Sequence, residues 1–140
     1  MDIKGRLKLP ADLRTYILGF GSGKVFVTSV DNRTVRIYPI SVWKDNLTFL
    51  KEYKKDPRAA ADVAFLANVN GGAGEMDDQG RVLVPQELRR KLNIENQSVW
   101  LDCFKSMVNV FGKDVYEERI RRAEAGLEEK VETLEKDGFQ

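Results

Sequence analysis

An internal repeat is the feature of this 140-residue sequence that most restricts its fold. Residues 2–14, DIKGRLKLPADLR, and residues 77–89, DDQGRVLVPQELR, share the pattern D-x-x-G-R-[LV]-x-[LV]-P-x-[DE]-L-R. The turn glycines of the two copies, Gly5 and Gly80, lie 75 residues apart, and the likeness continues in order over about forty residues. A repeated unit that cannot bury its apolar face alone packs against its neighbour. The sequence therefore predicts two similar halves that fold together.

Each copy predicts the same local structure. The glycine suits a tight turn in which a side chain would clash. Apolar residues at alternating positions after it predict a half-buried strand, and the proline ends that strand and begins a short helix. A β-hairpin follows in both copies. The expected helices span 11–18 and 86–92, and the expected hairpin strands span 24–30, 34–38, 98–103 and 107–111.

Further helices are expected between the two copies. Ser41 can cap a helix through about residue 55, and the pair Asp56-Pro57 suits the N-cap and first turn of a second helix through about residue 67. The glycines and asparagines of 68–74 predict a loop. These boundaries divide the chain into a first unit, a helical connector with its loop, a second unit and a C-terminal helix, at 1–45, 46–74, 75–117 and 118–140.

The C-terminal segment 113–136 predicts one long charged helix. Its apolar residues recur at spacings of three and four and form a single stripe. Such a stripe packs either on its own domain or on another subunit, and both alternatives stay open. The stripe consists of Ile120, Ala123, Leu127, Val131 and Leu134.

Composition excludes several classes of function. The chain has no histidine and one cysteine, Cys103. Catalysis by Ser-His-Asp or Cys-His groups needs an imidazole base, and a zinc site needs more ligands than one thiol. A single cysteine also excludes an internal disulfide framework. No apolar run is long enough for a membrane helix, so we expect a cytoplasmic protein without a membrane partner.

Charge is distributed unevenly along the chain. The net charge is only +1, but residues 1–112 carry 17 basic and 13 acidic side chains, whereas residues 113–140 carry 6 and 9. A mildly basic body is therefore followed by an acidic tail. Because phosphates repel acidic groups, any nucleic-acid contact is expected on the body.

The two D-x-x-G-R-[LV]-x-[LV]-P units, with helices between and after them, resemble the MraZ family, and each unit resembles the AbrB-type swapped-hairpin half-motif. The resemblance implies an α+β fold of two pseudo-symmetric swapped-hairpin β-barrel halves with connecting and C-terminal helices. The first half is expected to lack the strand that precedes the motif in the family, because the chain begins Met1-Asp2.

The same resemblance implies a function. It implies a cytoplasmic, nucleoid-associated transcriptional regulator that binds direct repeats in double-stranded promoter DNA. The expected regulator is a repressor of a division and cell-wall gene cluster. It is expected to form ring-like homo-oligomers, such as an octamer, and to need neither a cofactor nor catalysis.

The family motif is an aspartate followed four residues later by an arginine. It falls on Asp2 with Arg6 and on Asp77 with Arg81. A guanidinium forms two-pronged contacts with guanine or phosphate, so both arginines are expected to bind DNA. The alternative is a salt bridge that closes the turn, and both can apply because the aspartate can orient the arginine.

Other polar side chains near the motif are expected to contact DNA as well. Lys4 stands inside the first turn, and Gln79 takes its place in the second turn, where an amide can bind adenine. Basic groups here would position phosphates without specifying sequence. The alternative for them is an ordinary solvated surface. The remaining expected DNA contacts are Lys8, Arg14 and Arg89.

Two other functions stay open. The half-motif would serve an antitoxin-like or scaffold protein if its main partner were another protein. An enzyme is the less favoured alternative, in which Glu75, Asp77 or Asp78 binds Mg²⁺ or acts as an acid–base group. The sequence contains no complete catalytic constellation, so neither a catalytic residue nor a metal site is assigned.

Overall fold

The two copies of the repeat meet in a two-stranded antiparallel ribbon. In the computed structural model, β1 (Arg6–Lys8) pairs with β5 (Arg81–Leu83), and Leu7 lies opposite Val82. These two residues occupy the same position of the repeat, so an approximate twofold axis passes between them. The structure describes residues 1–140, apart from the side chain of Phe104.

Backbone hydrogen bonds around the ribbon follow this symmetry. Leu9 N donates to Gly80 O at 2.9 Å, and Val84 N donates to Gly5 O at 3.0 Å. Each glycine closes its turn with a positive φ, +82° at Gly5 and +76° at Gly80, which residues with a side chain rarely adopt. Both copies therefore follow the same backbone path from the turn to the strand.

A second sheet contains the antiparallel strands β2 (Lys24–Thr28), β3 (Val35–Pro39), β4 (Gly72–Glu75), β6 (Trp100–Phe104) and β7 (Met107–Phe111). Their order is β4-β2-β3-β7-β6, so the equivalent hairpins of the two copies join at β3 and β7. β4 leads directly into the motif of the second copy and pairs with β2 of the first. The two copies are therefore interleaved.

Two short helices follow the ribbon strands. α1 (Ala11–Leu18) and α4 (Gln86–Lys91) each begin directly after a proline, Pro10 or Pro85. The fixed φ of proline suits the entry to a helix. The predicted bounds of the first helix are confirmed, and α4 ends one residue earlier than expected.

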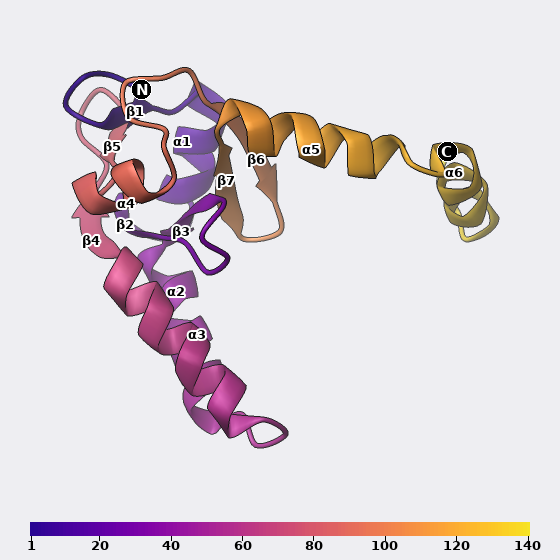
Figure 1. Ribbon diagram of the computed structural model, residues 1–140, viewed down its shortest axis with the longest axis horizontal. Helices are drawn as coiled ribbons and strands as arrows, with labels where there is room; N and C mark the ends of the chain where they lie inside the picture. The colour runs from indigo at the N-terminus through magenta and orange to yellow at the C-terminus, as the bar shows by residue number, and fades with distance from the viewer.

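A helical hairpin projects from the body of the molecule (Figure 1). It consists of α2 (Ile40–Glu52) and α3 (Pro57–Asn70), which pack against each other. α3 begins as predicted after Asp56, whose side chain accepts a hydrogen bond from Ala59 N at 3.0 Å. Ser41 is not the N-cap of α2, because this helix begins one residue earlier, directly after the proline that ends β3.

The C-terminal helix is broken in two. α5 (Lys113–Glu124) and α6 (Leu127–Lys136) are separated at Gly126, which has a φ of +64°. The prediction of one continuous helix is wrong, because a left-handed residue ends the α-helical path. Figure 1 shows α5 pointing away from the body, with α6 at its far end. The apolar stripe does not pack on its own domain there, since Leu127 and Leu134 are 51% and 54% exposed.

One apolar core serves both repeat copies. It lies between the ribbon, α1, α4 and the central strands of the larger sheet. Because each copy fills part of the core around the other, the two halves are expected to unfold together. The core residues are Leu7, Leu9, Ile17, Val25, Val27, Val35, Ile37, Val82, Val84, Leu88, Ile94, Val108 and Val110.

The α+β class is confirmed, but the swapped-hairpin barrel is not. Over the described residues, the two sheets stay open and neither closes into a barrel. The prediction of a loop over 68–74 is wrong, because α3 continues to Asn70 and β4 follows. Glycine and alanine in β4 lack the apolar alternation by which strands are recognised, so only its backbone pairing reveals it.

None of the helices that the structure describes has both the length and the apolar character needed to cross a membrane.

Candidate nucleic-acid interface

An aspartate organises the first turn of the ribbon. Asp2 Oδ1 accepts hydrogen bonds from the backbone N–H groups of Lys4 at 3.0 Å and Arg6 at 2.8 Å. Asp2 Oδ2 accepts a further hydrogen bond from Arg6 Nε at 2.9 Å. The backbone hydrogen bond from Arg6, aided by the guanidinium, lowers the pKa of Asp2 below its ordinary value. The carboxylate is therefore charged at neutral pH.

The second turn repeats this geometry. Asp77 Oδ1 accepts hydrogen bonds from Gln79 N and Arg81 N, both at 2.9 Å, and Asp77 Oδ2 accepts one from Arg81 Nε at 2.7 Å. The backbone hydrogen bond from Arg81 likewise lowers the pKa of Asp77. The salt bridge considered for each turn is thus present, and the same bridge can orient the arginine.

The bridge leaves part of each guanidinium available. In both turns the aspartate binds Nε, and the terminal nitrogens of Arg6 and Arg81 donate no hydrogen bond to any described residue. These nitrogens are the ones that make two-pronged contacts with guanine or phosphate. A structural role for the bridge and a binding role for the arginine are therefore compatible.

The outer face of the β1–β5 ribbon carries three cations. Arg6, Lys8 and Arg81 alternate with the buried residues of the two strands, and Lys8 lies directly opposite Arg81. Like charges opposite each other on paired strands repel, and a bound anion would relieve the repulsion. Leu83, which is 57% exposed, completes this face opposite Arg6. We call these four residues the basic ribbon face.

The structure brings five of the predicted site residues to this ribbon and its two turns. Lys4, Lys8 and Gln79 are exposed, while Arg6 and Arg81 are half-buried, with 32% and 26% of their side chains exposed. Because β1 and β5 are antiparallel, the turns lie at opposite ends of the ribbon. The repeat thus produces one continuous surface from two distant parts of the sequence.

Two predicted DNA contacts lie elsewhere. Arg89 is only 5% exposed and donates hydrogen bonds to Val84 O at 2.7 Å and to Lys4 O at 3.2 Å. Arg14 is half-buried and packs on the second turn, where a Cβ added to Gly80 would lie 2.0 Å from Arg14 Cδ. The structure therefore places Arg89 inside the fold, where it cannot reach a phosphate, and places Arg14 against backbone.

A hollow of about 480 Å³ opens beside the second turn. Its wall includes Arg14 and the carboxylates of Glu75, Asp77 and Asp78. A magnesium-dependent enzyme would need such carboxylates to converge on one ion. Among the described residues, no three acidic or thiol groups lie close enough together to bind a metal ion. The hollow therefore gives no support to a magnesium-dependent enzyme.

Comparison with known proteins identifies the family. Residues 72–137 match the family model described as "MraZ protein, putative antitoxin-like". The transcriptional regulator MraZ of Caldanaerobacter subterraneus is 30% identical over 138 residues, which cover 96% of this chain and 91% of that protein. The transcriptional regulator MraZ of Acidobacterium capsulatum is 36% identical over 99 residues, which cover 71% of this chain and 68% of that protein. The chain belongs to the MraZ family.

Membership of the MraZ family agrees with the resemblance carried by the repeat. The transcriptional regulator MraZ of Thermoanaerobacter pseudethanolicus is also 30% identical over 138 residues, with 96% of this chain and 91% of that protein covered. Alignments of this length include both repeat copies. The likeness to MraZ proteins therefore extends over nearly the whole chain.

Proposed function

We propose that this MraZ-family chain is a sequence-specific, double-stranded DNA-binding regulator of transcription, without catalytic activity and without a cofactor. The observation that carries the proposal is the basic ribbon face. There Lys8 stands opposite Arg81, and each motif arginine is oriented by its own aspartate. The names of the relatives, which are transcriptional regulators, support the same proposal.

A two-stranded ribbon has the right shape for this task. The major groove of B-DNA accepts a two-stranded β-ribbon as well as an α-helix. In the proposed complex, the terminal nitrogens of Arg6 and Arg81 bind guanine or phosphate. Lys4 and Lys8 contact phosphates and fix the position of the ribbon along the duplex.

Two neutral side chains complete the proposed contact surface. Gln79 is exposed at the tip of the second turn, and its amide can bind adenine through paired hydrogen bonds. Leu83 is exposed on the ribbon face, where it can pack on a thymine methyl group. Base contacts of these kinds would add sequence preference to the attraction of the phosphates.

One subunit presents few cations, so its binding to DNA is weak and sensitive to salt. Linked subunits that bind repeated sites gain about 10²- to 10⁴-fold in avidity. We therefore propose a ring-like homo-oligomer, such as an octamer, acting on promoter direct repeats in the cytoplasm and nucleoid. Head-to-tail assembly gives successive subunits the same orientation, which matches direct repeats. The resemblance to MraZ favours a repressor of a division and cell-wall gene cluster.

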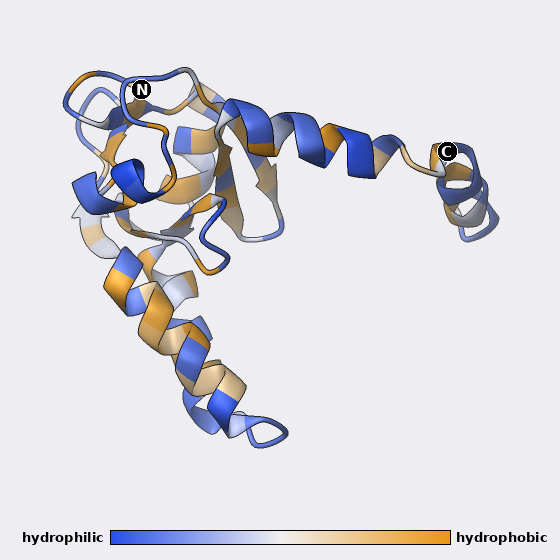
Figure 2. Cartoon of the chain, viewed as in Figure 1, coloured by the Kyte–Doolittle hydropathy of each residue, from blue (hydrophilic) through white to orange (hydrophobic). Residues whose placement is uncertain are grey.

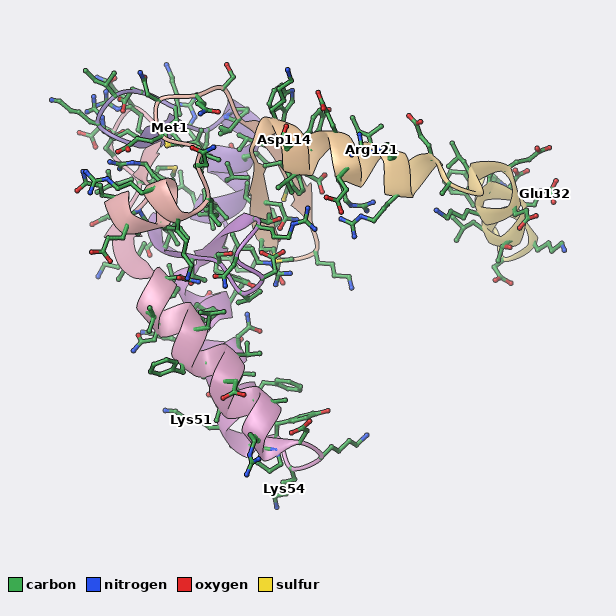
Figure 3. The ribbon with its side chains drawn as sticks, in the orientation of Figure 1. Met1, Lys51, Lys54, Asp114, Arg121 and Glu132 are labelled. Atoms are coloured by element: carbon green, nitrogen blue, oxygen red, sulfur yellow. The ribbon has the colours of Figure 1, made fainter. Side chains whose placement is uncertain are left out.

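Two projecting parts of the chain support self-association. Exposed aromatic side chains lie on the α2–α3 hairpin, where Phe49 and Phe65 are 60% and 71% exposed, and Figure 2 shows apolar colour on this hairpin and on α6. Figure 3 shows Lys51 and Lys54 at the hairpin end and Glu132 on α6. These surfaces have opposite charge as well as exposed apolar groups, so they are suited to contact a second copy.

The proposal is tested by salt-titrated fluorescence anisotropy with the duplex that lies upstream of the gene. Arg81→Ala should weaken specific binding by about 5- to 150-fold, the range for loss of one base-contacting arginine. Arg119→Ala is the matched control, because Arg119 is exposed on α5, away from the ribbon, and loses the same charge. Equal affinities of the two variants would contradict the proposal.

An antitoxin-like module that binds a protein partner is the second candidate function. The description of the matching family model and the exposed aromatic side chains of the α2–α3 hairpin favour it. In that case Phe65→Ser would weaken partner binding, and loss of the ribbon cations would leave it unchanged. Pull-down of a purified candidate toxin is compared for the Phe65→Ser variant and for a variant in which the cations of the basic ribbon face are replaced by alanine. Loss of the toxin in the first variant alone separates this function from DNA binding.

A further inference from the structure

We propose that Arg89 and Arg14 are positioning residues that couple the short helix of each repeat copy to the DNA-contacting turn of the other copy. Each arginine comes from the helix that follows the ribbon in one repeat copy, and each fixes the turn of the other copy. The inference rests on the proposed function, since it concerns how the proposed contact surface keeps its geometry.

The first observation is the placement of Arg89 against the first turn. Arg89 begins in the second copy, yet its Nη1 donates to Lys4 O in the first turn at 3.2 Å, in addition to Val84 O at 2.7 Å. A Cβ added to Gly5 would lie 1.5 Å from the same nitrogen. The guanidinium therefore occupies the space that the missing side chain of Gly5 leaves.

The buried charge of Arg89 also has a counter-ion. Arg89 Nη2 lies 3.6 Å from Glu95 Oε1, and the side chain is only 7% exposed. Burying a cation costs free energy unless it has a counter-ion and hydrogen-bond acceptors, and Lys4 O in the first turn is one of these acceptors. A shift of the first turn would remove this acceptor from the buried guanidinium. The position of Lys4 and the burial of Arg89 are therefore linked.

The second observation is that Arg14 occupies the equivalent place on the second turn. Its Cδ, Nε and Cγ would lie 2.0, 2.8 and 3.0 Å from a Cβ added to Gly80. Both arginines have a buried Nε without a hydrogen-bond partner among the described residues. Arg89 adds a hydrogen bond from Nη1 to the first turn, whereas Arg14 contacts the second turn by packing alone. The coupling is thus reciprocal but unequal, and Arg89 contributes more to the first turn than Arg14 contributes to the second.

A double-mutant cycle distinguishes this coupling from general stabilisation. The perturbation is Arg89→Met, which keeps the length of the side chain but removes its hydrogen bonds and charge. It is combined with a silenced first turn, Lys4→Ala with Arg6→Ala, and separately with a silenced second turn, Gln79→Ala with Arg81→Ala. Affinity for the upstream duplex is measured at a salt concentration at which every variant still binds.

The expected result is selective. Arg89→Met weakens binding by about 2- to 10-fold in the wild-type background and with the second turn silenced, the range for losing the restraint of a contact side chain. It has no further effect once the first turn is silenced. Arg14→Met shows the opposite selectivity with a smaller factor. A global loss of stability would act equally in both backgrounds.

The controls keep the outcome interpretable. Arg90→Met removes the same charge from the next residue. The Arg90 side chain is 64% exposed, and its Nε lies 3.7 Å from Oε2 of the same Glu95. This variant should weaken binding equally in the two silenced backgrounds. Arg89→Lys keeps the charge and should restore part of the affinity. If Arg89→Met fails to fold, Arg89→Lys is used as the perturbation, with the same selectivity expected at a smaller factor.

Amide hydrogen exchange supplies a readout that does not depend on DNA. In Arg89→Met, exchange at Gly5 and Arg6 should rise while exchange at Gly80 and Arg81 stays at its wild-type rate. The coupling would be overturned if Arg89→Met lowered the DNA affinity by the same factor in both silenced backgrounds and left amide exchange in the first turn unchanged. Full affinity of both silenced variants would instead overturn the proposed function, and the coupling of DNA contacts with it.

Discussion

Replacing Asp77 by asparagine separates the two roles proposed for the motif aspartates. In Asp77→Asn the amide oxygen can still accept the backbone hydrogen bonds of Gln79 and Arg81, both 2.9 Å long in the wild-type chain. The amide nitrogen cannot accept the bond from Arg81 Nε, which is 2.7 Å long with the carboxylate. The turn should therefore persist while the guanidinium loses its orientation.

The magnitude follows from that single lost restraint. Ordering one flexible side chain on binding corresponds to about a 2- to 10-fold change in a binding constant, so specific affinity should fall by that factor. Removal of a negative charge beside the ribbon acts in the other direction and should strengthen binding to any duplex. The ratio of specific to non-specific affinity is therefore the decisive quantity, and it should fall.

Anisotropy titrations with the upstream duplex and with a scrambled duplex measure this ratio. Asp78→Asn is the control, because Asp78 is exposed, stands next to Asp77 and loses the same charge without touching the arginine. It should tighten binding to both duplexes and keep their ratio. The reasoning is refuted if Asp77→Asn behaves as Asp78→Asn does.

Three further results are expected. Gly5→Ala should lower the free energy of unfolding by more than the about 1–2 kcal/mol of a strained positive φ, because it also displaces Arg89. Gly21→Ala shares the positive φ but meets no atom within 4 Å, so denaturant unfolding should show the smaller loss. Deletion of residues 126–140 should reduce the oligomer mass in light scattering without lowering the melting temperature, because α6 has no buried residue. Because the pKa of Asp2 and of Asp77 is depressed, their contribution to stability is present at neutral pH and lost only below about pH 4, which melting curves from about pH 3 to 7 would show.

Much of the local structure could be predicted because its causes are local. The order of turn, strand, proline and helix follows from the φ preferences of glycine and proline and from alternating apolar residues. The Asp–Arg bridges were also open to prediction, since the two residues of each bridge belong to one short motif. The α+β class and the family likewise follow from the doubled pattern.

The rest depended on contacts between distant segments. Nothing near Arg89 in the sequence distinguishes it from the exposed Arg90, and its burial results from the missing side chain of Gly5 in the other copy. The opposition of Lys8 and Arg81 requires the register of the ribbon, which the sequence pattern does not contain. The strand β4 could not be predicted because its glycine and alanine residues lack the apolar alternation that is typical of strands. Only its pairing with β2 in the structure identifies it.

The covalent joining of the two copies has an evolutionary consequence for the ribbon. In a dimer of identical half-motifs, each substitution appears on both sides of the twofold axis, so the preferred target must be a palindrome. In this chain the two copies can differ from each other. Lys4 in the first turn corresponds to Gln79 in the second, and Lys8 corresponds to Leu83. A fused pair of this kind can distinguish the two directions along a duplex, which a strictly symmetric pair cannot.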